Sequence, residues 1–305
     1  MCPERWRTSN GTSKSIKAST RYARHSRAMC RNCPNIRQGL EAKDVTQKCP
    51  SPLARRHAPA QGLMKAMLLS AGFGMRLRPL TEATPKPLLP LGGVPILGWN
   101  LLLLKRHGIT DAVINLHHLG ERIVETLRDG SQYSMRLAYS HEPALLGTGG
   151  GIKQAEPFLK DGTFLVLNGD TVSECDLTGL VSAHRVSGAL ATLALREDPA
   201  AEEWGAVATN RQGRILQIKN QPPVMKDTEA SASWMFAGIH VLEPAVLDAI
   251  PAGPGSIIDV YITLLRQGGH LQGWRMTGYW SDIGTRERYA QAQKDVERGC
   301  LRPAH

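Results

Sequence analysis

The sequence predicts an α/β protein with a Rossmann-like sheet that is mixed but mainly parallel and has helices on both faces. Between residues 64 and 185, short apolar runs alternate with amphipathic segments, which is typical of βαβ units. Two of the runs, at 67–71 and 163–167, are short and continuously apolar, as in fully buried parallel strands. Closely spaced short runs in 189–276 favour additional antiparallel strands.

The expected elements follow the chain in order. Strands are predicted at 67–71, 112–116, 135–139 and 163–167. Helices are predicted at 96–107, 119–127 and 177–185, and a further helix follows the glycine-rich stretch 146–151 and ends at about residue 155. The second half is predicted to add strands at 189–195, 205–209, 215–218, 235–242 and 271–276, with helices at 244–250 and 257–266. Thr285 is expected to cap a last helix. Ligands of such a sheet bind at the carboxyl ends of its parallel strands.

The basic charge of the chain is confined to its beginning. Residues 1–63 contain 13 Lys and Arg and 3 Asp and Glu, whereas 64–305 contain 24 of each class, so the first segment accounts for the net charge of +10. It shows no helical or strand period, and we expect a disordered extension that is a mis-assigned start or dispensable. A transit peptide and a basic tail that binds acidic surfaces or nucleic acid are the alternatives. The neutral part 64–305 is the expected functional domain and gives no reason to expect nucleic-acid binding.

Cysteine usage and hydropathy bear on the location of the protein. Only Cys175 and Cys300 follow residue 63, which fits a reducing compartment, the cytoplasm, and no disulfide framework. No apolar run approaches the length of a membrane span, so no membrane association is expected. The sequence leaves open whether the protein forms a homo-oligomer.

The loop after the first strand contains the strongest functional signal. Gly72 and Gly74 interrupt the apolar run directly after Ala71, and glycines let successive backbone N–H groups approach an anion such as a polyphosphate. The same loop contains three cations against one acid and is stiffened by three prolines, which reduces the entropy lost when a ligand binds. The cations are Arg76, Arg78 and Lys86. Phosphate binding is the prediction, and an ordinary βα turn with solvated cations is the alternative.

Two common glycine loops are excluded at this position. The stretch lacks the Gly-Lys-Ser/Thr of a Walker loop, and Leu77 stands where a dinucleotide fingerprint requires its third glycine. The predicted phosphate loop is therefore of another kind.

Two further loops contain candidate site residues. Gly149 and Gly150 lie in a glycine-rich stretch at a helix start, where free N–H groups and small residues let a flat ring lie against the backbone. A flexible helix-start loop is the alternative reading of this stretch. Asp170 ends the apolar run that begins at Thr163, and a carboxylate just past a buried parallel strand suits an oxygen-preferring ion such as Mg²⁺.

The motifs together resemble a known family. The pattern Gly72-x-Gly74-x-Arg76-x-x-Pro79-x-Thr81 with Pro85-Lys86-Pro87 is similar to the signature of sugar-1-phosphate nucleotidylyltransferases, or NDP-sugar pyrophosphorylases. The segment 279–285 resembles the closing motif of the family, and the resemblance extends from about Met64 to Val296. It implies a nucleotide-diphospho-sugar transferase fold. It also implies transfer of a nucleotidyl group from a nucleoside triphosphate (NTP) to a sugar 1-phosphate, with release of pyrophosphate.

The resemblance also implies roles for individual residues. Arg76 would stabilise the departing pyrophosphate, and Lys86 would hold the α-phosphate or the incoming phosphate. Asp170 and Asp282 would share a Mg²⁺ ion. Contacts to the nucleotide are expected from Ala71, Gly72, Gly74, Gly149 and Gly150, and contacts to the sugar phosphate from Trp204 and Gly205.

One family element is missing, and the substrates stay open. The Glu-Lys-Pro motif that binds the sugar phosphate in many members is replaced by Asn220-Gln221-Pro222, with Lys219 adjacent. The loop 146–151 resembles those of mannose-1-phosphate guanylyltransferases, whereas 114–117 resembles short uridylyltransferases of cell-wall sugars. GTP with a mannose 1-phosphate-like acceptor is slightly favoured. A uridylyl- or thymidylyltransferase, or a non-catalytic NDP-sugar-binding regulatory subunit, is the alternative.

Overall fold

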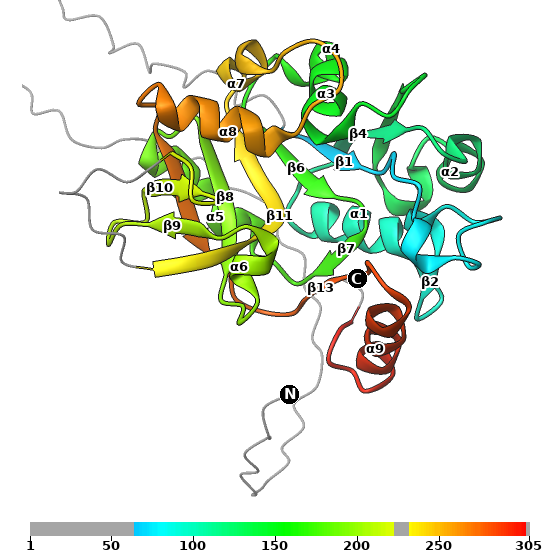
Figure 1. The fold of residues 1–305 in the computed structure, drawn as a ribbon. Coiled ribbons are helices and arrows are strands. Elements are labelled where there is room, and N and C mark those ends of the chain that lie inside the picture. Colours follow the sequence, from blue (N-terminus) through cyan, green and yellow to red (C-terminus); the bar gives the residue numbers. More distant parts are fainter. Residues whose placement is uncertain (1–63, 223–231, 303–305) are drawn as a thin grey trace, which may run out of the picture. The chain divides into compact units, whose positions relative to one another are not determined.

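The structure is a computed structural model that describes residues 64–222 and 232–302. The basic segment 1–63 lies outside the described residues, so its interpretation and the domain boundary after it stay predictions. The described part has one nine-stranded sheet with helices on both faces (Figure 1). The expected α/β fold class is confirmed.

Four parallel strands form one side of the sheet, in the order β5-β4-β1-β6, with β5 at the edge. Their bounds are β1 Lys65–Leu69, β4 Asp111–Leu116, β5 Arg136–His141 and β6 Phe164–Asn168. The long strand β11 lies antiparallel to β6, and four more strands extend the sheet beyond it, with bounds β11 Ala232–Leu242, β8 Ala191–Arg196, β9 Val207–Thr209, β10 Ile215–Ile218 and β12 Leu271–Arg275. Leu69 pairs with both Asn115 and Asn168, so the loops after β1, β4 and β6 leave the sheet at one edge.

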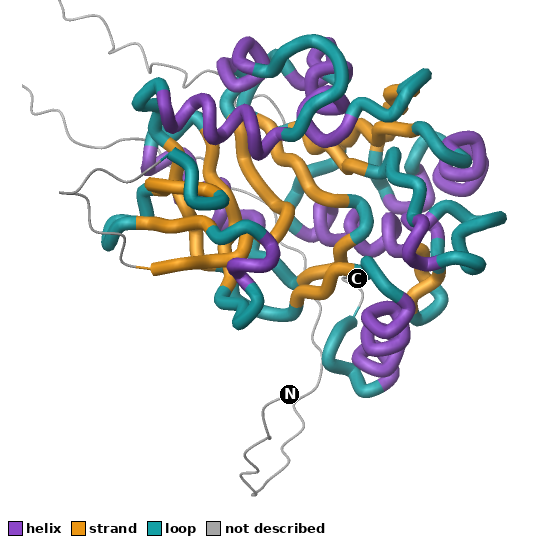
Figure 2. Tube along the Cα trace, viewed as in Figure 1, coloured by secondary structure: helices purple, strands orange, loops and turns teal. Residues whose placement is uncertain are grey.

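The helices divide between the two faces of this sheet (Figure 2). One face is covered by α1 Ile96–Arg106, α2 Gly120–Leu127 and α5 Leu177–Ser187. The other is covered by α3 Gly147–Gln154, α4 Glu156–Leu159, α7 Ala245–Ala249 and α8 Ile257–Arg266. Leu68 and Ile114 belong to the buried cluster on the first face, and Met67 and Val113 belong to that on the second. Neighbouring residues of a strand point to opposite faces, so the continuous apolar runs of β1 and β4 fill both cores.

A third buried cluster joins the loop after β1 to the last helix, α9 (Arg286–Glu297). It contains Leu77 from the loop, Trp99 from α1, and Ile283 and Ala292 from the C-terminal part. Beside it, β13 (Trp280–Asp282) pairs antiparallel with β7 (Thr171–Ser173). Segments about 100 to 200 residues apart in sequence are thus held next to one another at the edge where β1 and β6 end.

Most predicted elements are present, and the differences have local causes. The strand expected at 67–71 ends at Leu69, because the backbone N–H of Ser70 donates to Asn115 Oδ1 at 2.7 Å instead of continuing the ladder. The strand expected at 205–209 begins at Val207, because Gly205 has a φ of +90°. The elements that the sequence analysis missed are short, namely β2 Pro90–Leu91, β3 Val94–Pro95, β7, β13, α4, α6 Ala201–Trp204, and the 3-10 helices η1 Met75–Leu77, η2 Lys86–Leu88 and η3 Ser131–Tyr133.

Two expectations about cysteines and membranes can be compared with the described residues. Cys175 is free and buried. The four cysteines of residues 1–63 lie outside the described residues, so the expectation of no disulfide framework stays a prediction. Among the helices of the described ranges, none combines the length and the apolar character that a membrane span needs.

The glycine-rich start of α3 packs against the loop that precedes α8. The N–H groups of Gly149 and Gly150 donate to the carbonyl oxygen of Gly255, at 2.9 and 3.4 Å. A Cβ atom on Gly150 would overlap the carbonyl oxygen of Gly253 and lie 2.9 Å from Leu146 Cβ. At this position glycine permits a close approach of two backbone segments.

We predict that Gly150→Ala lowers the free energy of unfolding by about 1–3 kcal/mol, because the added methyl group meets backbone rather than a movable side chain. Urea unfolding of the variant measures this effect. Gly162→Ala is the matched control, since a Cβ at Gly162 has no neighbour within 4 Å. Equal unfolding midpoints for the two variants would contradict the packing role of Gly150.

A second prediction concerns His240, a buried residue of β11 whose ring contacts the hydroxyl of Tyr261 on α8. Burial lowers the pKa of His240 to about 3. The unfolded chain, with a histidine pKa of about 6.5, therefore takes up a proton as the pH falls, whereas the folded chain does not. Folding stability should decrease from about pH 6.5 downward, and melting temperatures of wild type and His240→Gln between pH 7 and 4 should show a shallower decline in the variant. Parallel curves would exclude His240 as a source of the acid sensitivity.

Candidate active site

A cavity of about 240 Å³ opens at the edge of the sheet where β1 and β6 end. Its lining comes from the loop after β1, from η2, and from the turns after β6 and β13. The lining residues are Leu69, Ser70, Gly72, Gly74, Met75, Arg76, Lys86, Pro87, Asp170 and Gly284. The structure thus brings Gly72, Gly74, Arg76, Lys86 and Asp170 together, as the sequence analysis expected. Ala71 is buried between two of the lining residues.

The conformation of the loop after β1 explains its glycines. Gly74 has a φ of +64°, which favours glycine, and Thr81 Oγ1 donates to its carbonyl oxygen at 2.8 Å. A Cβ at Gly74 would also lie 3.2 Å from Lys86 Cβ. Gly72 differs, because a Cβ there would meet nothing within 4 Å. The conformation of the loop therefore favours glycine at position 74, whereas Gly72 lines the cavity and has free space around its Cβ position.

Asp170 reaches the cavity through a tight turn after β6. The N–H of Gly169 donates to the carbonyl oxygen of Leu69 at 2.9 Å, and a Cβ on Gly169 would overlap Ser70 Oγ. The turn therefore lies directly against the end of β1. This close approach places the carboxylate that follows it beside the loop of β1.

Asp282 is brought to the same point by strand pairing. In the pairing of β13 with β7, Asp282 lies opposite Thr171, the residue after Asp170. The N–H of Ile283 donates to the carbonyl oxygen of Asp170 at 3.0 Å. Two carboxylates that are far apart in the sequence therefore become neighbours.

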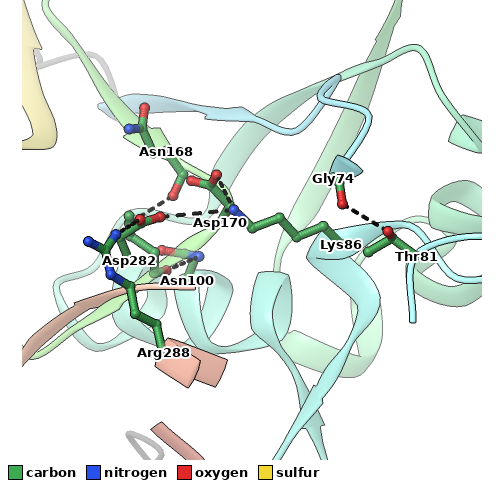
Figure 3. Close-up of polar contacts among 9 residues, drawn as sticks. Gly74, Thr81, Lys86, Asn100, Asn168, Asp170, Asp282 and Arg288 are labelled. Carbon is green, nitrogen blue, oxygen red and sulfur yellow. Dashed lines mark hydrogen bonds and ion pairs between the residues drawn. The ribbon is translucent and has the colours of Figure 1, made fainter. Parts of the chain in front are cut away.

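The two carboxylates converge on one buried lysine (Figure 3). Lys86 Nζ lies 2.6 Å from Asp170 Oδ2 and 3.9 Å from Asp282 Oδ1, and Lys86 is 7% exposed. Burial raises the pKa of the Asp282 carboxyl, and the negative charge of Asp170 raises it further, while Lys86 and Arg288 act in the opposite direction. The repulsion between the carboxylates makes this position favourable for a cation.

A second cavity of about 240 Å³ shares two residues of its lining with the first, Arg76 and Asp170. Its wall is completed by β6, β7, α6, β11 and β13, with Asn168, Thr171, Trp204, Met235, Phe236, Ala237, Gly238, Trp280 and Asp282. Trp204 lines this cavity, and its expected contact with the sugar phosphate stays a prediction. Gly205 is not part of this lining, and a Cβ on Gly205 would lie 2.6 Å from Lys219 Cγ.

Two carboxylates, Asp170 and Asp282, are available for a metal ion in this site. Among the described residues there is no cluster of three or more His, Cys, Asp or Glu that could hold a metal ion. Mg²⁺ is commonly held by one or two carboxylates together with water and substrate phosphate oxygens. The contact of Asp170 and Asp282 with one ammonium group shows that both carboxylates can face a single cation. The donor set therefore fits Mg²⁺ that is completed by substrate.

Gly149 and Gly150 lie apart from the first cavity, and their described backbone contacts are to the loop before α8. Their expected contact with the nucleotide stays a prediction.

Arg288 is a residue that the sequence analysis missed. Its Nη1 atom lies 2.6 Å from Asp282 Oδ2, and its guanidinium carbon lies 4.6 Å from the centre of the Trp204 ring. In the sequence, Arg288 is only a cation in the first turn of a predicted helix, and no local pattern indicates its contact with Asp282 or with Trp204.

Comparisons with known proteins identify the family of this chain. The family model described as nucleotidyl transferase matches residues 65–299. A UTP-glucose-1-phosphate uridylyltransferase of Synechocystis is 36% identical over 248 residues, with 76% of this chain and 63% of the relative covered. An N-acetylmuramate alpha-1-phosphate uridylyltransferase of Neisseria meningitidis is 39% identical over 237 residues, with 75% of this chain and 97% of the relative covered.

A solved structure shows the same fold. It is assigned as a glucose-1-phosphate thymidylyltransferase of Bacillus anthracis, with 26% identity and a TM-score of 0.65, and the match covers 76% of this chain and 94% of that one. Other relatives are mannose-1-phosphate guanylyltransferases. The chain spans 63% of the length of the Synechocystis relative and 97% of the Neisseria relative. With a family model matched over most of its length, this chain belongs to the nucleotidyl transferase family.

Proposed function

We propose that this protein transfers a nucleotidyl group from an NTP to a sugar 1-phosphate and releases pyrophosphate. The observation that supports this most directly is the convergence of Asp170 and Asp282 on Lys86 where two cavities meet. Two cavities that share Arg76 and Asp170 suit a reaction between two phosphate-bearing substrates, with a cation between them.

The first cavity is the proposed site of the NTP. Glycines at its wall leave the backbone accessible to phosphate oxygens, and Gly72 leaves open space there. Arg76 lines both cavities, so its guanidinium can contact phosphate groups on either side. The second cavity, with the indole rings of Trp204 and Trp280, is the proposed site of the sugar 1-phosphate.

The chemistry needs positioning and charge rather than a general base. An oxygen of the sugar phosphate, already anionic, attacks the α-phosphorus in line, a new P–O bond forms, and the bond to the bridging oxygen breaks as pyrophosphate leaves. Lys86 and Arg76 provide positive charge on the two sides of the reacting phosphorus. Mg²⁺, held by Asp170 and Asp282, would neutralise phosphate oxygens of both substrates. Correct positioning alone contributes on the order of 7–11 kcal/mol to such a step.

GTP and UTP are both candidates for the nucleotide. The glycine-rich loop 146–151 favours GTP, with mannose 1-phosphate or a related sugar as acceptor. The relative that the chain spans over 97% of its length is a uridylyltransferase, and this supports UTP with a cell-wall sugar phosphate. The two readings differ in substrate and agree on the reaction.

The first test is pyrophosphate release by the full chain in the presence of Mg²⁺. GTP, UTP, dTTP, CTP and ATP are each combined with mannose, glucose, N-acetylglucosamine and N-acetylmuramate 1-phosphates. We expect turnover with one pair well above the others. Silence across all pairs, with NDP-sugar binding retained in calorimetry, would favour the alternative of a non-catalytic NDP-sugar-binding regulatory subunit.

We predict that Asp170→Asn and Asp282→Asn each reduce kcat at least about 100-fold, because each removes a charge that the cation needs. Asp282→Asn should keep the melting temperature, since burial already disfavours the charged form of Asp282. Asp161→Asn is the control, because that exposed carboxylate pairs with Lys65 at 2.9 Å and lines neither cavity. Normal Mg²⁺-dependent turnover in either site variant would contradict the assignment of the two carboxylates.

A further prediction concerns Gly72. Its Cβ position is open, so Gly72→Ala should change the free energy of unfolding by less than about 1 kcal/mol. The methyl group would enter the first cavity, however, and we expect KM for the NTP to rise at least tenfold with KM for the sugar 1-phosphate unchanged. Steady-state kinetics with each substrate varied in turn gives both constants, with Gly162→Ala as control. An unchanged KM for the NTP would place the triphosphate away from this loop.

A further inference from the structure

Arg288 contacts two residues of the second cavity's wall, Asp282 and Trp204. It lies in the first turn of α9, and its Nη1 atom donates to Asp282 Oδ2 at 2.6 Å (Figure 3). Its guanidinium carbon lies 4.6 Å from the centre of the Trp204 ring. Both Asp282 and Trp204 line the second cavity. Arg288 itself is not part of the lining, and its guanidinium is held against two residues of the cavity wall by an ion pair and by an aromatic ring.

The second cavity otherwise contains little positive charge. Arg76 is the one cation in its described lining, and it also faces the first cavity. Lys86 Nζ is 2.6 Å from Asp170, and the stem of Lys219 packs where Gly205 has no side chain. Asp170 and Asp282 both contribute negative charge. A sugar 1-phosphate carries a dianionic group, so a further cation close to the two carboxylates, in addition to the proposed Mg²⁺, would strengthen its binding here.

The geometry at Asp282 leaves Arg288 suited to this task. The two oxygens of the carboxylate have different neighbours, Oδ1 lying 3.9 Å from Lys86 Nζ and Oδ2 lying 2.6 Å from Arg288 Nη1. One oxygen thus stays available on the side of Asp170 while the other orients the guanidinium. Arginine has five N–H donors, and within the described residues one of those of Arg288 has an acceptor. The side chain is 40% exposed, so a ligand can reach the others.

We infer that Arg288 is a substrate-binding residue that holds the phosphate of the sugar 1-phosphate and supplies the charge that the missing Glu-Lys-Pro motif lacks. This inference rests on the proposed function. The acceptor phosphate must lie beside Asp170 and Asp282 to reach the α-phosphorus, and Arg288 is in direct contact with one of them. A planar guanidinium binds phosphate through two parallel hydrogen bonds, and the ring of Trp204 fixes its plane.

The test compares the full chain with Arg288→Gln, Arg288→Lys and a matched control, Arg298→Gln. Arg298 is an exposed arginine that directly follows α9 and lines neither cavity. We expect Arg288→Gln to raise KM for the sugar 1-phosphate at least tenfold, with KM for the NTP and the half-saturating Mg²⁺ concentration within twofold of wild type. Arg288→Lys should be intermediate, because it keeps the charge and loses the planar fork. Arg298→Gln should match wild type.

Isothermal titration with mannose 1-phosphate and glucose 1-phosphate in the presence of Mg²⁺ gives a readout that does not need turnover. Weaker binding of at least one of them by Arg288→Gln, with an unchanged melting temperature, supports the inference even if no NTP pair is active. If the glutamine variant fails to fold, the same comparison is made with the lysine variant. An unchanged affinity and KM in the folded variant, or no binding of either sugar phosphate by wild type, would overturn the inference. A shifted Mg²⁺ requirement with an unchanged KM for the sugar 1-phosphate would overturn it too, because Arg288 would then only position Asp282.

Discussion

The contact of one buried lysine with two carboxylates is the constraint on which the site depends. Burial raises the pKa of Asp282, and the negative charge of Asp170, which shares the same small space, raises it further. Lys86 offsets the repulsion, because its ammonium group lies 2.6 and 3.9 Å from the two acids. The short helix η2 holds the lysine in place between two prolines. The rest of the fold keeps three distant segments together at this point.

Three features of the backbone produce that convergence. The parallel register of β1 with β6 brings both strand ends to one level, and the glycine turn after β6 packs against the end of β1. The pairing of β13 with β7 then places Asp282 opposite the residue after Asp170. The third apolar cluster joins the loop after β1 to α9, the helix that contains Arg288. Together these contacts join the two halves of the chain around Lys86, Asp170 and Asp282.

Glycine serves three different purposes around this site. Gly74 adopts a positive φ, Gly150 allows two backbone segments to approach, and Gly72 leaves open space at the cavity wall. All three look alike in the sequence, where they indicate loops with close backbone approach. A sequence pattern gives the conformational freedom of a glycine, but it does not give the atoms that come close. For Gly149 and Gly150 the described close neighbour is the protein backbone itself.

The sequence by itself determined the α/β class, the approximate positions of the longer helices and strands, and the residues of the loop after β1. Apolar periodicity and turn residues act over short distances, so they can be read along the chain. It also indicated Asp170, as an acid after a buried strand, and Asp282, by the resemblance of its segment to the closing motif of the family. Only the tertiary structure decided that both carboxylates meet at Lys86, that Gly149 and Gly150 pack against the loop before α8, and that Arg288 lies between Asp282 and Trp204. These contacts join residues that local pattern cannot relate, because strand register and the packing of α9 fix their distances.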